Sequence, residues 1–67
     1  MKIGDKVRTT KMPESSHYLW VEGTITRIEN GWADIRATFV QDKWSDTPHQ
    51  HSTSCATSAK IGDLVLA

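Results

Sequence analysis

The sequence predicts an all-β fold of short strands, and two observations support this prediction. Thr, Val, Ile and Trp recur along the chain, and these residues favour strands over helices. No window repeats apolar residues at the i, i+3, i+4, i+7 spacing of a helix that packs on a core. Because the chain has 67 residues, we expect a single domain that covers residues 1–67.

The first predicted strand covers residues 5–11 and places Val7 and Thr9 on one face. A loop follows at residues 12–17. Pro13 has no N–H to donate to a sheet, and the serines that follow it favour turns. The chain therefore leaves the sheet after its first strand and re-enters it near residue 18.

The second predicted strand covers residues 18–29, YLWVEGTITRIE. Val21, Gly23 and Ile25 share one face of this strand, whereas Ile28 falls on the opposite face. A glycine inside a strand favours a bulge, which shifts the alternation of the residues beyond it. We therefore expect a bulge at Gly23.

Asn30-Gly31 is the strongest turn signal in the chain. Asn-Gly between two strands favours a type I′ turn, because both central residues must adopt positive φ. The third predicted strand, residues 32–40, alternates apolar and polar residues, which is typical of a strand with one buried face. Its predicted inward residues are Ala33, Ile35, Ala37 and Phe39.

The last third of the chain has weaker signals. Residues from about 41 to 51 predict a long polar loop, since they include Pro48 and few apolar residues. A fourth strand is predicted at residues 51–57, which contain few apolar residues. Residues 58–64 favour a short 3₁₀ turn, and residues 64–66 a short last strand.

Residues 2–8, KIGDKVR, and residues 60–66, KIGDLVL, nearly repeat one phrase. Nothing between them resembles a second repeat unit, so we expect one local turn used twice at the two ends of the sheet. If the first and last strands pair, the apolar residues of both phrases meet in the core. The residues predicted to be buried together are Ile3, Val7, Ile61 and either Leu64 or Val65.

The order of these motifs resembles the SH3-like small barrels. GDKVR at the start, EGTITRI, a strand that ends at Phe39 and a terminal GDLV carry the resemblance. Within this class, KVR, PESSHYLW, EGTITRI and Trp44 are similar to the photosystem I subunit PsaE and the NdhS-type subunit of the photosynthetic NDH complex, while KOW and Tudor-like modules share the G-D-x-V opening. The resemblance covers residues 3–44 and 58–66. It implies a five-stranded SH3-like barrel with a short 3₁₀ turn before the last strand.

Charge and composition bear on the class of partner. Eight Lys and Arg balance eight Asp and Glu, whereas a nucleic-acid binder of this size is usually basic. No apolar run approaches the roughly 20 residues of a membrane helix. Cys55 has no second cysteine to pair with, and Met1 is followed by no secretion signal. We therefore expect a cytoplasmic protein with no membrane partner, and the neutral balance of charge argues against a nucleic-acid partner.

Aromatic residues provide the candidate binding surface. Trp, Tyr and Arg are the usual anchors of protein interfaces, although one or two tryptophans could instead seal the ends of a small barrel. The sequence predicts a non-enzymatic binding module that docks a protein partner or associates with its own copies, and the weakly apolar fourth strand offers an open edge for self-association. The candidate binding residues are Tyr18, Trp20, Trp32, Arg36 and Trp44.

His49, His51 and Cys55 are residue types that bind zinc. On an extended strand, however, four residues span about 13 Å, so His51 and Cys55 could share a metal only if the chain bends. A Cys-His pair also needs a third orienting group and an oxyanion hole to act as a nucleophile, and no motif supplies them. We therefore expect no metal, no cofactor and no catalytic residue.

Two other classes of function stay open. One is an oligomer that binds a small molecule or nucleotide in a pocket between its subunits, with residues 45–55 as a lid. The other is a nucleic-acid binder of the KOW or Tudor-like type, which needs a local basic patch despite the neutral balance of charge.

Overall fold

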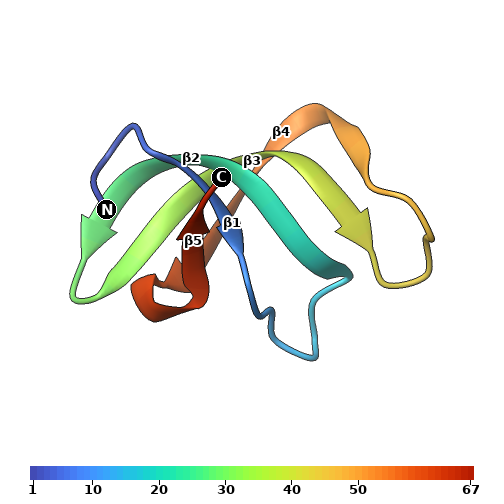
Figure 1. The fold of residues 1–67 in the computed structure, drawn as a ribbon, viewed down its shortest axis with the longest axis horizontal. Helices are drawn as coiled ribbons and strands as arrows, with labels where there is room; N and C mark the ends of the chain where they lie inside the picture. Colours follow the sequence, from blue (N-terminus) through green and yellow to red (C-terminus); the bar gives the residue numbers. More distant parts are fainter.

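The computed structural model describes residues 1–67, apart from the side chain of Ser52. It contains five strands and one short 3₁₀ helix, so the all-β prediction is confirmed (Figure 1). The elements are β1 Lys6–Thr9, β2 Tyr18–Glu29, β3 Trp32–Asp42, β4 His49–Lys60, η1 Ile61–Asp63 and β5 Leu64–Leu66. Within the described chain, no helix has the length and apolar character needed to cross a membrane.

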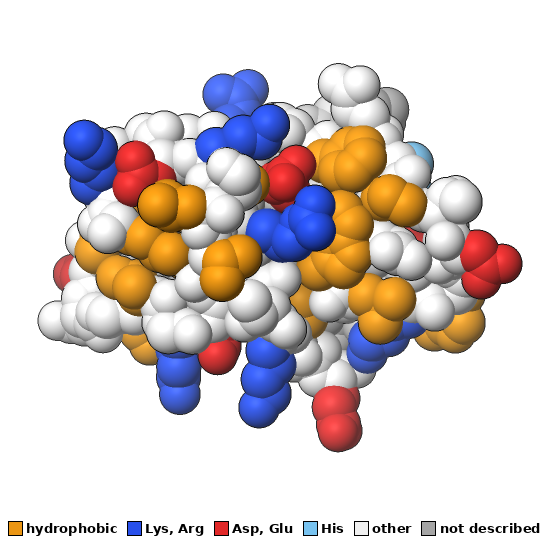
Figure 2. All heavy atoms as spheres, viewed as in Figure 1, with side chains coloured by type: hydrophobic (Ala, Val, Ile, Leu, Met, Phe, Trp, Pro, Cys, Tyr) orange, Lys and Arg blue, Asp and Glu red, His pale blue; other side chains and the backbone are white. Residues whose placement is uncertain are grey.

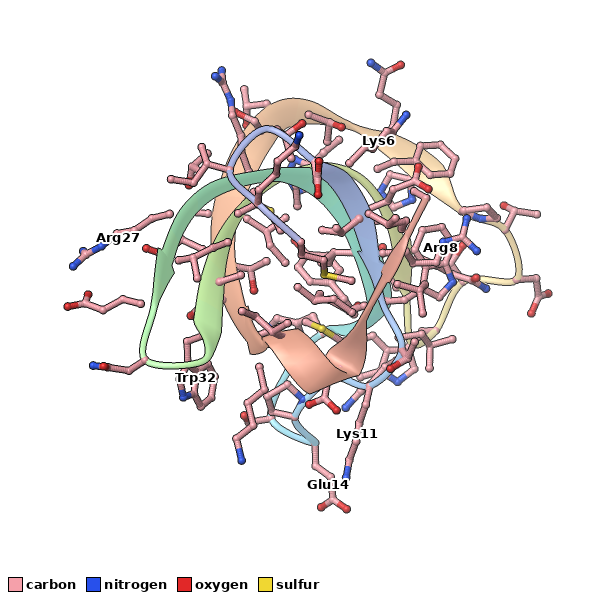
Figure 3. All side chains as sticks on the ribbon, turned by 60° about the vertical axis from the view of Figure 1, so that its left-hand side comes forward. Lys6, Arg8, Lys11, Glu14, Arg27 and Trp32 are labelled. Atoms are coloured by element: carbon pink, nitrogen blue, oxygen red, sulfur yellow. The ribbon has the colours of Figure 1, made fainter. Side chains whose placement is uncertain are left out.

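The strands form one antiparallel sheet in the order β4-β3-β2-β1-β5. The predicted pairing of the first and last strands is confirmed, because Val7 lies opposite Leu66 and Thr9 lies opposite Leu64. The predicted closure into a barrel is not confirmed. β5 is three residues long and pairs with β1, and no ladder joins it to β4 among the described residues. The sheet is strongly curled but open at these two edges (Figure 3).

The Asn30-Gly31 turn fixes the register of the central hairpin. Both residues adopt positive φ, 51° at Asn30 and 78° at Gly31, which confirms the predicted conformation. Glu29 therefore lies opposite Trp32. The strand predicted before the turn has the bounds of β2, and the strand predicted after it extends to Asp42 rather than residue 40.

The predicted bulge at Gly23 lies on the opposite strand. Glu22 pairs with Phe39 and Gly23 pairs with Ala37, so Thr38 of β3 is the extra residue. A Cβ atom at Gly23 would lie 2.0 Å from the carbonyl oxygen of Arg36. Glycine is therefore required here because the β3 backbone passes too close for any side chain.

The extra residue in β3 also corrects one predicted core position. Ala33, Ile35 and Ala37 are buried as expected. Beyond Thr38 the alternation changes face, so Val40 is fully buried while Phe39, predicted to point inward, is half-buried. A second shift, between Ile25 and Arg27 of β2, lets Ile28 pack against the core.

The core has two parts, one at each end of the curled sheet. The first contains Val7, Ile25, Ala33, Ile35, Ala59 and Leu64, and the second contains Val21, Ala37 and Val40. The side chains of this interior lie inside the ring of strands in Figure 3.

The two KIGD phrases adopt different structures, which corrects the expectation of one shared turn. Gly4 has a φ of 95°, and its N–H donates to the carbonyl of Ile25. Ile61 instead begins a 3₁₀ helix, and its N–H donates to the carbonyl of Gly31. Ile61 therefore packs beside Val7 and Leu64, whereas Ile3 is 63% exposed and the prediction of its burial is wrong.

The predicted loop at 41–51 is shorter, because β3 and β4 continue to Asp42 and His49. β4 starts earlier and ends later than the predicted strand at 51–57. Its regular ladder with β3 runs from Lys60 to Cys55 and resumes at Gln50, opposite Phe39. Residues 51–54 therefore form an irregular segment that bends the strand.

Candidate functional site

A groove beside Trp32 is lined by three separate segments of the chain. Its volume is about 250 Å³. One wall comes from the loop between β1 and β2, one from the start of β3, and one from the end of β4 with η1. The lining residues are 11–13, Trp32, 58–60 and Asp63.

The Asn30-Gly31 turn places the indole of Trp32 on the outer side of the sheet. Ala33 is fully buried, and because side chains alternate along a strand, the side chain before it points outward. Trp32 is 47% exposed. Its register partner is Lys60, whose ammonium lies 5.7 Å from the centroid of the indole ring. Such a contact contributes about 0.5–1 kcal/mol at an exposed site and holds the ring against the end of β4.

The opposite wall of the groove is tied to η1. The backbone N–H of Thr10 donates to the carbonyl of Asp63 at 2.8 Å, and the hydroxyl of Thr10 donates to the same oxygen at 3.1 Å. Met12 packs against the core cluster of Val21, Ala37 and Val40. These contacts hold the loop in place, so the groove exists before any partner arrives.

The groove combines apolar surface with a basic rim. Met12, Pro13 and the Trp32 ring supply the apolar part, while Lys11, Lys60 and Asp63 supply the charged part of the lining. In Figure 3 the labelled side chains of Trp32 and Lys11 lie on the same lower side of the sheet. An extended segment with an apolar side chain would fit this composition.

Trp20, another predicted binding residue, is held by its own neighbours. Its indole N–H donates to the side-chain oxygen of Gln41 at 2.9 Å, and its ring packs against Phe39 at a centroid distance of 5.8 Å. The guanidinium of Arg8 lies over the ring, 4.3 Å from its centroid, and also pairs with Glu22 at 3.5 Å. Trp20 therefore offers less free surface to a partner than Trp32 does.

Tyr18 is the first residue of β2 and packs against the Val21, Ala37 and Val40 cluster. Its hydroxyl lies 3.2 Å from Nε2 of His51. Burial raises the pKa of Tyr18 above its ordinary value, and the negative charges of Cys55 and Asp42 raise it further. Tyr18 is thus a half-buried packing residue rather than an exposed anchor.

The remaining predicted binding residues are separate from the groove. Trp44 is 80% exposed in the loop after β3, and its ring lies 5.8 Å from the ring of His17. Arg36 lies on the outer face of β3, where its Nε donates to the hydroxyl of Ser54 at 3.0 Å. The five predicted binding residues therefore occupy different places and do not form one aromatic patch.

The structure does not bring the candidate metal ligands together. His49 lies 3.9 Å from Asp42, His51 faces Tyr18, and Cys55 packs against the second core cluster. Among the described residues, no group of three or more His, Cys, Asp or Glu side chains could hold a metal ion.

The residues that line the groove beside Trp32 were missed by sequence reasoning, apart from Trp32 itself. Met12-Pro13 could have indicated this groove, because an apolar side chain in a loop needs a neighbour to cover it. Nothing in the sequence around Lys60 and Asp63 indicates the groove, since the position of these residues depends on how the sheet curls.

Charges of both signs are mixed with hydrophobic side chains on the face seen in Figure 2. This pattern agrees with the neutral balance of the chain and provides no extended basic stripe on that face for a phosphate backbone. Comparisons of the chain with models of protein families, with curated proteins and with solved structures found no match.

Proposed function

We propose that the chain is a non-enzymatic binding module that docks an extended segment of a partner protein in the groove beside Trp32. The observation that carries the proposal is the half-exposed Trp32 ring above a groove with fixed walls. Tryptophan is among the residues most enriched at the energetic centre of interfaces. A preformed groove also avoids the entropic cost of ordering a loop during binding.

The dimensions of the groove favour a side chain over a complete small molecule. Its volume of about 250 Å³ lies below the roughly 300–1,000 Å³ of typical ligand pockets. A single apolar residue of a peptide fits such a space, and the flanking Lys11 and Lys60 add favourable contacts to acidic or carbonyl groups beside it.

The fold proposal is that the curled sheet is an SH3-like barrel left open between β4 and β5. The strand order β4-β3-β2-β1-β5 and the 3₁₀ helix before the last strand support it. In this arrangement the groove lies between the loop after β1 and the start of β3.

Selection from a displayed peptide library tests the proposal without a known partner. Peptides enriched on the wild-type protein are expected to lose at least tenfold in affinity for Trp32→Ala and to bind Trp44→Ala normally. Both tryptophans are exposed, so circular dichroism should show that each variant keeps the wild-type fold. Equal binding of selected peptides to the wild-type protein and Trp32→Ala would overturn the proposal.

A further inference from the structure

We propose that two copies of the chain pair edge to edge through β4, along an edge that shares Ser58 with the lining of the groove beside Trp32. β4 ends the strand order on one side, and its outer edge has no ladder partner among the described residues. β5 ends the order on the other side but has three residues, too few to template a long ladder. β4 is therefore the edge available for pairing.

The backbone hydrogen bonds show which groups point out of this edge. The N–H and C=O of Ile25 bond to Asp5 and Gly4, on the β1 side of β2. In an antiparallel sheet both polar groups of a residue point to one side, and the side alternates along the strand. Ile35 of β3 lies opposite Ile25, so the backbone N–H and C=O of Ile35 point away from β2 and towards β4. The residue of β4 opposite Ile35 is Thr57.

The same alternation continues along β4. The backbone N–H of Ile61 donates to the carbonyl of Gly31. This bond agrees with the alternation, in which the backbone N–H and C=O groups of Thr57 and the odd-numbered residues after it point towards β3. The N–H and C=O groups of Ala56 and Ser58 therefore point away from β3 into the open edge. They are strong hydrogen-bonding groups that another strand could satisfy.

The side chains along this edge do little to block a second strand. Ser54, Ala56 and Ser58 are small and exposed. Exposed edges in natural proteins are commonly protected by lysine, proline, bulges or charge. The segment from Gln50 to Ala59 contains no Asp, Glu, Lys, Arg or Pro, and the irregular segment at 51–54 leaves residues 55–59 as a regular, uncharged stretch of the edge.

A second copy of the chain is the occupant that fits this edge. Two identical antiparallel strands are related by a two-fold axis, so the same groups serve on both sides. With Thr57 on the axis, Ala56 of one copy lies opposite Ser58 of the other, and each such pair exchanges two backbone hydrogen bonds. Cys55 of one copy then lies opposite Ala59 of the other, so no like charges meet within the regular part of the edge.

The dimer would also support a strand that contributes little to the core. Of the β4 side chains that the structure describes, Ala59 is the one that is buried. A domain of this size buries a small share of its surface, and association is one of the usual means of stabilising it. Pairing at β4 would extend the sheet through both copies.

Light scattering after size exclusion and native mass spectrometry test the dimer. The wild-type protein is expected at twice the 7.5 kDa of one chain. Ser58→Pro is expected to be a folded monomer, because it removes an N–H that points away from β3 and places its ring in the edge. A wild-type protein that stays monomeric up to its solubility limit would overturn the proposal.

The register makes a sharper prediction for paired charges. The double variant Ala56→Lys, Ser58→Lys places lysines opposite lysines and should be monomeric, whereas Ala56→Lys, Ser58→Glu places opposite charges together and should dimerise. Both pairs of substitutions lie on exposed positions, so their effects on folding are matched. Equal dimerisation by the two double variants would contradict this edge as the interface.

Discussion

The hydroxyl of Tyr18 in β2 lies 3.2 Å from Nε2 of His51 in β4. These strands are not neighbours, because β3 lies between them in the sheet. The two side chains can meet because the sheet curls at this end and because β4 leaves its regular register at residues 51–54. The contact thus closes one end of the core over Val21, Ala37 and Val40, without a ladder between the edge strands.

The first prediction concerns the ionisation of Tyr18, the single tyrosine of the chain. Burial raises its pKa above the ordinary value of about 10, and the Cys55 and Asp42 charges add to the effect. The folded state holds the proton more tightly than the unfolded state does, so stability is lost as the pH rises above the ordinary pKa and through the folded one. The ultraviolet absorbance of tyrosinate measures this titration directly.

Cys55→Ser provides the control for that titration. A serine hydroxyl does not ionise in this range, so the pKa of Tyr18 should fall towards its ordinary value while burial keeps it raised. If Tyr18 titrates alike in the folded and the denatured wild-type protein, the packing described for its ring is wrong.

The second prediction concerns Gly23→Ala. The new Cβ would meet the Arg36 carbonyl oxygen at 2.0 Å and the Ala37 Cα at 2.7 Å, and backbone atoms cannot move aside as a flexible side chain can. We expect a loss of about 3 kcal/mol or more in the free energy of unfolding, at the upper end for overpacked sites. Urea denaturation followed by circular dichroism measures the loss.

Gly62→Ala is the matched control, because a Cβ at Gly62 meets no atom within 4 Å. It should change stability by less than about 0.5 kcal/mol, as substitutions at open surface positions usually do. Equal stability of the two alanine variants would show that β2 and β3 are farther apart at Gly23 than described.

The third prediction concerns Thr9, the buried polar residue of β1. Its hydroxyl accepts a hydrogen bond from the backbone N–H of Val21 at 3.0 Å. Thr9→Val keeps the shape of the side chain but leaves that N–H without its acceptor, which should cost about 1–3 kcal/mol. The midpoint of thermal or urea unfolding gives the difference.

Thr9→Ser separates the hydrogen bond from the packing. Serine keeps the acceptor and loses one methyl group, whose burial contributes roughly 1 kcal/mol. Amide exchange of Val21 should be fast in Thr9→Val and slow in Thr9→Ser. Slow exchange in both variants would mean that another group accepts the Val21 N–H.

The fourth prediction compares two isoleucines that the sequence treated alike. Ile35 is buried in the first core cluster, so Ile35→Val should lower the free energy of unfolding by about 0.5–1.5 kcal/mol. Ile3 is largely exposed, so Ile3→Val should leave it within about 0.5 kcal/mol of wild type. If Ile3→Val lowered the free energy of unfolding more than Ile35→Val does, Ile3 would be buried as the sequence predicted.

Local chemistry allowed much of the central hairpin to be predicted. Asn30-Gly31 fixed the turn, and alternation identified Val21, Ile25 and Ile35 as inward residues. Burial of Phe39 was predicted wrongly because the extra residue in β3, Thr38, depends on the close approach of two backbones at Gly23, which alternation within one strand does not encode.

The ends of the sheet were less predictable. Most residues of β4 are polar, and the strand forms because its backbone pairs with β3. The alternation of apolar and polar residues therefore predicted the length of β4 poorly. The two KIGD phrases have the same letters but different partners, Ile25 for Gly4 and Gly31 for Ile61. Trp32 is exposed, but the residues that make a groove beside it come from segments that meet through the curl of the sheet.

The most direct test of the central claim is a nuclear magnetic resonance titration of the protein with a peptide selected on the wild-type chain. The three tryptophans give three indole N–H signals, from Trp20, Trp32 and Trp44. Binding in the groove predicts that the Trp32 signal moves together with the amides of Lys11, Met12, Lys60 and Asp63. Shifts centred on Trp20 or Trp44, with the Trp32 signal unchanged, would contradict the claim.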